Sequence, residues 1–176
     1  MVLPKGFNIE EVEKGIRELV INLNRIPGVR TIIPTCEGHV YYYDFEEWPA
    51  KEGIISFCAE KHHSEWLVET IKDFCGRIEY FEFKGPQNQF GKTYYEIIAS
   101  FESHHDDKLN DLFGKMGVRE QMGYVKRAKK RKNRILAGWK RLNDLVEDYI
   151  KQNISEDVES LPYREPDYVL HEAIHA

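Results

Sequence analysis

The sequence predicts one α+β domain, in which a helix is followed by two strand–strand–helix units and a long C-terminal helix. Its 176 residues match the roughly 100–200 residues of a single domain built around one core. Apolar residues recur at helical spacing near both ends of this domain, and between them they alternate with polar residues as in a half-buried sheet. We therefore expect the domain to span residues 1–152 and an acidic, flexible tail to follow over residues 153–176.

The first half of the domain begins with strong helix signals. Asn8 can act as the N-cap, Glu11 lies three residues later, and Phe7 and Val12 can form a hydrophobic staple. The helix is expected to end before Pro27. The elements expected next are strands at residues 29–36, 40–43 and 54–59, a tight turn at 36–39, an edge or strand-end position for Pro34, and a helix that Ser64 caps and Gly76 closes.

The second half repeats this order of elements. Residues 78–84 and 93–103 are predicted to be strands joined by a connection over residues 85–91. A short helix is expected from Asp106 or Asp107. The last helix is expected over residues 119–150, its first half projecting into solvent or onto a partner and its packing stripe made of Ile135, Leu136, Trp139, Leu142, Val146 and Tyr149.

Charge is distributed unevenly along the chain. The 25 Lys and Arg and the 30 Asp and Glu give a net charge of −5. Residues 115–141 hold eleven of the bases and one acid, Glu120, which leaves 14 bases and 29 acids elsewhere. A basic stripe on an acidic body is typical of polyanion binding, and the alternative is a solvated helix that neutralises its own domain. The candidate RNA-backbone contacts are Lys126, Arg127, Lys129, Lys130, Arg131, Lys132 and Arg134.

Composition argues against several classes of protein. Charged residues make up 31% of the chain, and no stretch approaches the about 18 consecutive apolar residues of a membrane helix or resembles a signal-peptide core. The three cysteines, Cys36, Cys58 and Cys75, are odd in number and form no CxxC pair, which disfavours a disulfide framework and a structural zinc finger. We expect a cytoplasmic protein with no membrane partner and no bound metal.

The densest chemistry lies in residues 31–39. A hydroxyl, a thiol, a carboxylate, a glycine and an imidazole follow one another within five residues, and glycine lets the backbone approach a ligand closely. Such a turn can hold a nucleobase or a cofactor. The alternatives are a hairpin turn with polar side chains and a purely structural cysteine. The candidate residues are Thr31, Thr35, Cys36, Glu37, Gly38 and His39.

Two double histidines occupy similar strand–helix junctions. His62-His63 and His104-His105 each follow an apolar strand and precede a helix, whose N-terminus favours anions. They can contact an anion or substrate when protonated, hold a metal when neutral, or be ordinary surface residues. An HExxH pattern spans residues 171–175 but lacks a downstream third ligand, so we do not expect a zinc protease. No dinucleotide fingerprint or P-loop occurs in the sequence.

Residues 16–39 resemble the start of the wybutosine-synthesis tRNA methyltransferase family, the 4-demethylwyosine N4-methyltransferases that act beside the anticodon of phenylalanine tRNA. In both, a helix ends in an asparagine, a Gly-Val pair follows, and a threonine-rich strand closes in a short motif. That motif is Ser-Cys-Ser-Gly-Arg in the family and Thr35-Cys36-Glu37-Gly38-His39 here. Glu37 and His39 thus replace the second serine and the arginine. The order of elements is similar over residues 10–150.

The resemblance implies a divergent, RNA-directed methyltransferase that uses S-adenosylmethionine and acts on a modified tRNA base. Methyl transfer requires alignment of nucleophile and methyl group, with a base to take a proton where needed. Two other hypotheses stay open: a non-catalytic nucleotide or nucleic-acid binding module, and a metal-dependent hydrolase that uses the histidine pairs. The catalytic candidates are Cys36, Glu37 and His39, with Glu37 or His39 as the base, and the cofactor- or substrate-binding candidates are Thr31, Thr35, Gly38, His62, His63, His104 and His105.

Overall fold

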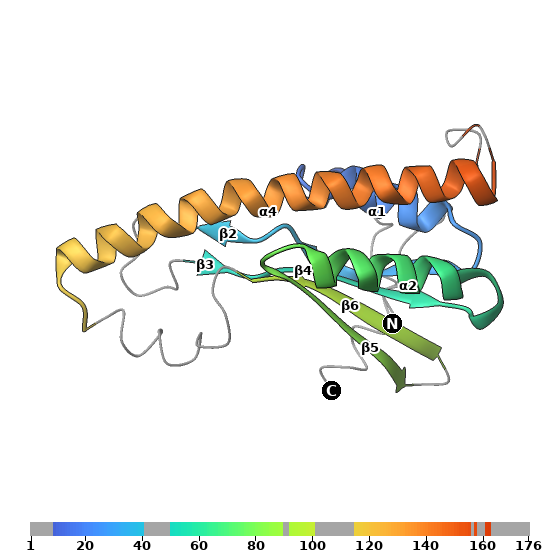
Figure 1. The fold of residues 1–176 in the computed structure, drawn as a ribbon, viewed down its shortest axis with the longest axis horizontal. Coiled ribbons are helices and arrows are strands. Elements are labelled where there is room, and N and C mark those ends of the chain that lie inside the picture. Colours follow the sequence, from blue (N-terminus) through green and yellow to red (C-terminus); the bar gives the residue numbers. More distant parts are fainter. Residues whose placement is uncertain are drawn as a thin grey trace, which may run out of the picture.

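A four-stranded antiparallel sheet lies at the centre of the computed structural model (Figure 1). The structure describes residues 9–40, 50–89, 92–100, 115–155, 157 and 161–162. Across the sheet the strands are ordered β1 (Val29–Cys36), β4 (Gly53–Ala59), β6 (Lys92–Ala99) and β5 (Phe81–Gln89). Two short strands, β2 (His39–Val40) and β3 (Ala50–Lys51), pair with each other as a separate ribbon.

The helices cover one face of this sheet (Figure 1). After a 3₁₀ turn at Ile9–Glu11, they are α1 (Arg17–Arg25), α2 (Lys61–Arg77) and α4 (Val118–Asn153). The long helix α4 contacts both α1 and α2, and its N-terminal half extends over β2. This arrangement confirms the predicted single α+β domain with a long C-terminal helix.

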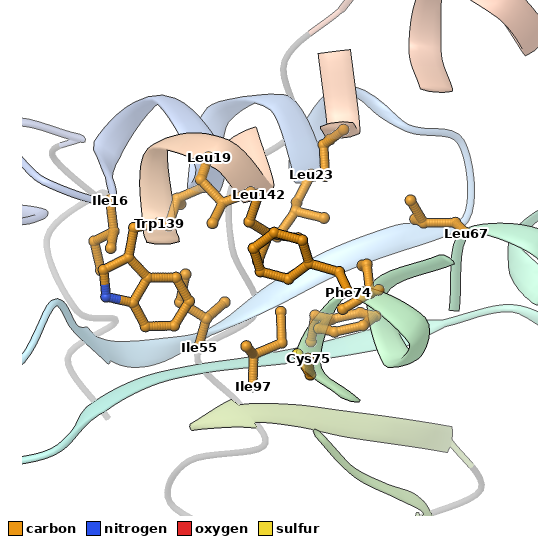
Figure 2. Packing of buried hydrophobic residues seen from close by; sticks show 14 of the residues in the cluster. Ile16, Leu19, Leu23, Ile55, Leu67, Phe74, Cys75, Ile97, Trp139 and Leu142 are labelled. Atoms are coloured by element: carbon orange, nitrogen blue, oxygen red, sulfur yellow. The ribbon is translucent and has the colours of Figure 1, made fainter. Parts of the chain in front are cut away.

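One apolar core fills the space between the helices and the sheet (Figure 2). Every second side chain of β4 is buried, as the alternating sequence predicts. Trp139 of α4 is fully buried, and the centroid of its ring lies 4.8 Å from that of Phe81 in an edge-on contact. The predicted packing stripe of the last helix is confirmed, because Leu136 is half-buried and the others are buried: Ile135, Trp139, Leu142, Val146 and Tyr149.

Both edge strands of the sheet contain a proline at an irregular register. The pairing of β1 with β4 shifts between Ile32 and Cys36, around Pro34, which confirms the expected edge position. The pairing of β5 with β6 shifts between Lys84 and Gln87, around Pro86. The predicted connection over residues 85–91 is therefore wrong, because β5 continues to Gln89. An edge strand accommodates the missing amide hydrogen of proline, so the strand does not stop there.

The first helix begins later than its capping signals predict. α1 starts at Arg17, and Ile9–Glu11 form a separate 3₁₀ turn. The predicted helix does not continue through Gly15, because the backbone N–H of this residue donates to the Glu37 carboxylate, 2.7 Å away. A Cβ at this glycine would lie 2.4 Å from Glu37 Oε2. The expected cap at Asn8 lies outside the described residues.

The other helix boundaries differ less from the predicted ones. α2 begins at Lys61 rather than after Ser64, and it continues one residue past Gly76. α4 begins and ends within three residues of the predicted 119–150. At 36 residues, it is about 54 Å long.

Several predicted elements lie outside the described residues. These are the strand extensions at 41–43 and 101–103, the short helix from Asp106 or Asp107, most of the acidic tail and the HExxH pattern at 171–175. Among the helices that are described, none is long and apolar enough to cross a membrane.

Candidate functional site

Hydrogen bonds with α4 and with the N-terminal segment hold the backbone of Glu37, directly after β1. Trp139 donates its indole N–H to the Glu37 carbonyl oxygen at 3.1 Å, and a carboxylate oxygen of Glu13 accepts the Glu37 backbone N–H. Cys36 is buried, and its Sγ lies 3.4 Å from the Gly38 backbone nitrogen that donates to it. Gly38 has a φ of +91°, a conformation that favours glycine. These contacts fix Cys36, Glu37 and Gly38 at the end of β1 and in the short connection to β2.

Both carboxylate oxygens of Glu37 already accept hydrogen bonds. Oε2 accepts the Gly15 backbone N–H at 2.7 Å, and Oε1 lies 2.7 Å from the Lys132 ammonium of α4. The Lys132 ammonium also donates to the Gly38 carbonyl oxygen. The Glu37 and Lys132 side chains are 17% and 19% exposed, so the ion pair is mostly shielded from water. The Glu37 carboxylate thus connects the end of β1 with the segment before α1 and with α4.

The remaining residues of the 31–39 segment lie apart from this carboxylate. Thr31 is fully buried, and its hydroxyl accepts a hydrogen bond from Asn24 Nδ2 at 2.6 Å, while Asn24 Oδ1 accepts the Thr31 backbone N–H. Thr35 is half-buried near the end of β1. His39 begins β2. Thr31 therefore has a structural role, because it provides hydrogen-bond partners for the buried side chain of Asn24.

The side chains of both histidine pairs lie outside the described part of the structure. His62 and His63 belong to the first turn of α2, while His104 and His105 lie outside the described residues. Within the part of the chain that the structure describes, no three His, Cys, Asp or Glu side chains are placed to hold a metal ion.

The seven candidate RNA contacts on α4 divide into two groups. Arg131 and Lys132 are half-buried and contact the protein itself, since the Arg131 guanidinium lies 5.4 Å from the Tyr80 ring centroid and Lys132 pairs with Glu37. Arg134 is exposed, and it reaches Glu79 at 3.5 Å and the Tyr80 hydroxyl at 3.3 Å. The exposed group is Lys126, Arg127, Lys129, Lys130 and Arg134.

Buried residues fix which face of α4 points outward. Ala128 is 3% exposed and Ile135, two helical turns later, is fully buried. The five exposed cations occupy the opposite arc of the helix, so they form one surface; we call it the basic face. The expectation that this half of the helix projects into solvent or onto a partner is only partly met, because Ala128 packs against the core.

An open hollow between α2 and α4 was not predicted from the sequence. It encloses about 440 Å³, and Trp66, which is 56% exposed, forms part of its wall. The sequence contains one signal for this hollow. Trp66 is a large apolar residue of α2 that is not in line with the buried residues of that helix, such as Leu67 and Ile71. Its lining residues are Trp66, Thr70, Arg141, Asp144, Leu145, Asp148, Tyr149 and Gln152.

Comparison of this chain with protein-family models, with curated proteins and with solved structures gives no match.

Proposed function

We propose that this protein binds RNA through the basic face of α4. The observation that carries the proposal is the arrangement of the five exposed cations between Lys126 and Arg134 on one side of a helix whose other side is anchored in the core. Cations fixed on a rigid helix can contact successive phosphates without further ordering of the backbone. Their contacts to phosphate supply affinity and little base discrimination.

The charge of the whole chain favours a local interface. Outside residues 115–141 the chain has 14 bases and 29 acids, so the rest of the chain carries a net negative charge that repels a polyanion. Attraction is therefore concentrated on α4. RNA is the polyanion that we select, because the residues 16–39 resemble those of a tRNA-modifying family.

The geometry of Glu37 supports binding more than catalysis. A general base must present an oxygen to the proton that it removes. Both oxygens of Glu37 accept hydrogen bonds from the protein, and the side chain is 17% exposed. Methyl transfer from S-adenosylmethionine with Cys36, Glu37 and His39 remains a prediction, which calorimetric titration of the cofactor, with and without tRNA, would test.

Two variants of equal charge test the proposed interface. In the first, Lys126, Arg127, Lys129 and Lys130 are replaced by Gln. The control replaces four exposed cations elsewhere, Lys72, Arg77, Lys84 and Lys151, by Gln. Each variant changes the net charge from −5 to −9. Affinity for an unmodified tRNA transcript is measured by fluorescence anisotropy at fixed salt.

We expect the first variant to bind about tenfold or more weakly than the wild type, because each lost phosphate contact removes a favourable counterion-release term. The control should stay within about twofold of the wild type, since its cations lie off the basic face. Equal losses in both variants would mean that net charge alone determines binding, and no binding by the wild type would refute the proposal.

A further inference from the structure

The hollow between α2 and α4 contains a tryptophan ring that the core does not bury. Trp66 is 56% exposed, more than the buried aromatic residues of the core. Its ring centroid lies 5.3 Å from that of Tyr149, with the two planes tilted by 35°. Tyr149 itself is buried. The ring of Trp66 thus lies beside Tyr149 while more than half of its surface faces solvent, so it can stack on a planar ligand.

The basic face of α4 leads toward this hollow. Arg127, Arg134 and Arg141 are each separated by seven residues, about two helical turns, so they lie on the same side of α4. Arg127 and Arg141 are about 21 Å apart along the axis, at 1.5 Å per residue. Arg141 lines the hollow beside Trp66. The row of cations therefore ends where the exposed ring begins.

We propose that this hollow seats one base of a single-stranded RNA whose phosphates follow the basic face. The base stacks on Trp66 and the adjoining phosphate contacts Arg141. Sites for single strands commonly combine a cationic track with aromatic stacking in this way. A duplex keeps its bases stacked inside, so it cannot offer a base to the ring. This inference rests on the function proposed above and adds the class of RNA.

The carboxylate of Asp148 indicates which bases fit the hollow. Asp144 and Asp148 both line the hollow, and the Lys140 ammonium donates to both oxygens of Asp144 at 3.1 Å, so Asp148 is the acceptor that we assign to the base. A carboxylate only accepts hydrogen bonds, so it matches the N1–H and N2–H₂ groups of guanine. Uracil offers a single N3–H donor, and the carbonyl oxygens on both sides of it would face the negative carboxylate. We therefore expect guanine to be preferred over uracil at the seated position.

Single-stranded and duplex RNA of about a dozen nucleotides distinguish this proposal from simple phosphate binding. We expect the wild type to prefer the single strand. Trp66→Leu should weaken binding of the single strand by about 5- to 150-fold, the effect of one stacked base, and leave binding of the duplex unchanged. Trp66→Phe, which keeps a ring, should recover part of the affinity. Melting by circular dichroism checks that both variants fold.

A measurement on the wild type does not depend on variants. The indole N–H resonance of Trp66, assigned by its loss in Trp66→Phe, should shift when the single strand is added and stay in place with the duplex. A further comparison uses two oligonucleotides that differ by one terminal base. The guanine form should bind more tightly than the uracil form, and Asp148→Asn should reduce that difference.

The outcomes separate the two proposals. If the wild type binds RNA through the basic face, but binds both RNA forms equally and Trp66→Leu has no effect, the seated base is refuted and the interface stands. If the Trp66 resonance does not move although the single strand binds tightly, no base stacks on this ring and the inference fails. If no RNA binds at all, the function proposed above fails first.

Discussion

Glu37 shows how one residue can connect distant parts of a small domain. Its carboxylate joins Gly15, before α1, to Lys132 of α4, and its carbonyl oxygen accepts the Trp139 indole N–H. Sequence reasoning selected this glutamate because it lies in a turn rich in functional groups. It offered Glu37 or His39 as the base, and it did not foresee the hydrogen-bond partners of the Glu37 carboxylate, which are 22 and 95 residues away in the chain. Contacts at such separation leave no local pattern in the sequence.

Replacement of Glu37 by Gln should therefore lower stability. The amide keeps the shape of the side chain but leaves the Lys132 ammonium without an opposite charge in a shielded position. We expect the free energy of unfolding to fall by about 1–3 kcal/mol. Arg77→Gln removes the exposed pair with Asp73 and should change stability by less than about 0.5 kcal/mol. Urea denaturation of both variants gives the comparison, and equal losses would contradict an anchoring role.

Ionisation of the Cys75 thiol should lower the free energy of unfolding at alkaline pH. Burial raises the pKa of this thiol from 9.0 to about 12. The folded state therefore holds the proton more tightly than the unfolded state, and its contribution to stability is complete below pH 9.0 and is lost as the pH rises toward about 12. Urea unfolding across that range should show a shallower decline for Cys75→Ala than for the wild type. The difference between the two curves gives the contribution of Cys75 alone, because the buried tyrosines are present in both proteins. Parallel curves would refute the predicted contribution of Cys75.

At the scale of elements, most of the fold follows from local patterns. Strands β1 and β4 and the long helix α4 are close to their predicted ranges because their apolar periodicity is regular. The errors occur where a tertiary contact overrides a local signal. α1 starts late because Gly15 bonds to Glu37, and β5 passes through Pro86 because it lies at the edge of the sheet. The distant neighbour of Gly15 cannot be read from the local sequence, and a Gly-Pro pair at residues 85–86 is equally compatible with a connection and with an edge strand.

Two glycines within α4 should respond oppositely to the same substitution. Gly123→Ala meets nothing closer than 3.6 Å and should stabilise the helix by about 0.5–1 kcal/mol. Gly138→Ala would bring a Cβ to 2.4 Å from the Phe81 ring. That ring packs against Phe74 and Trp139, so it cannot move freely. We expect a loss of about 1–3 kcal/mol by overpacking.

Thermal or urea unfolding of the two alanine variants measures this contrast directly. Because both positions lie in the same helix, the gain in helix propensity is common to both. Stabilisation by Gly138→Ala would mean that α4 does not pack on β5 as closely as described.

At the scale of the molecule, the distribution of charge matters more than its sum. The sequence locates the basic segment, but it does not reveal which cations face outward. That depends on the rotational setting of α4, which Ala128, Ile135 and the Lys132–Glu37 pair fix together. The hollow at Trp66 also escaped sequence reasoning, since its two walls come from helices far apart in the chain.

The salt dependence of RNA affinity tests the central claim most directly. For a single strand, the slope of log K against log salt is about −0.7 for each phosphate contacted. Replacing Lys126, Arg127, Lys129 and Lys130 by Gln should make that slope less negative by about 2–3, while the control with Lys72, Arg77, Lys84 and Lys151 replaced should keep the slope of the wild type. An unchanged slope in the first variant would show that the basic face of α4 does not contact phosphates.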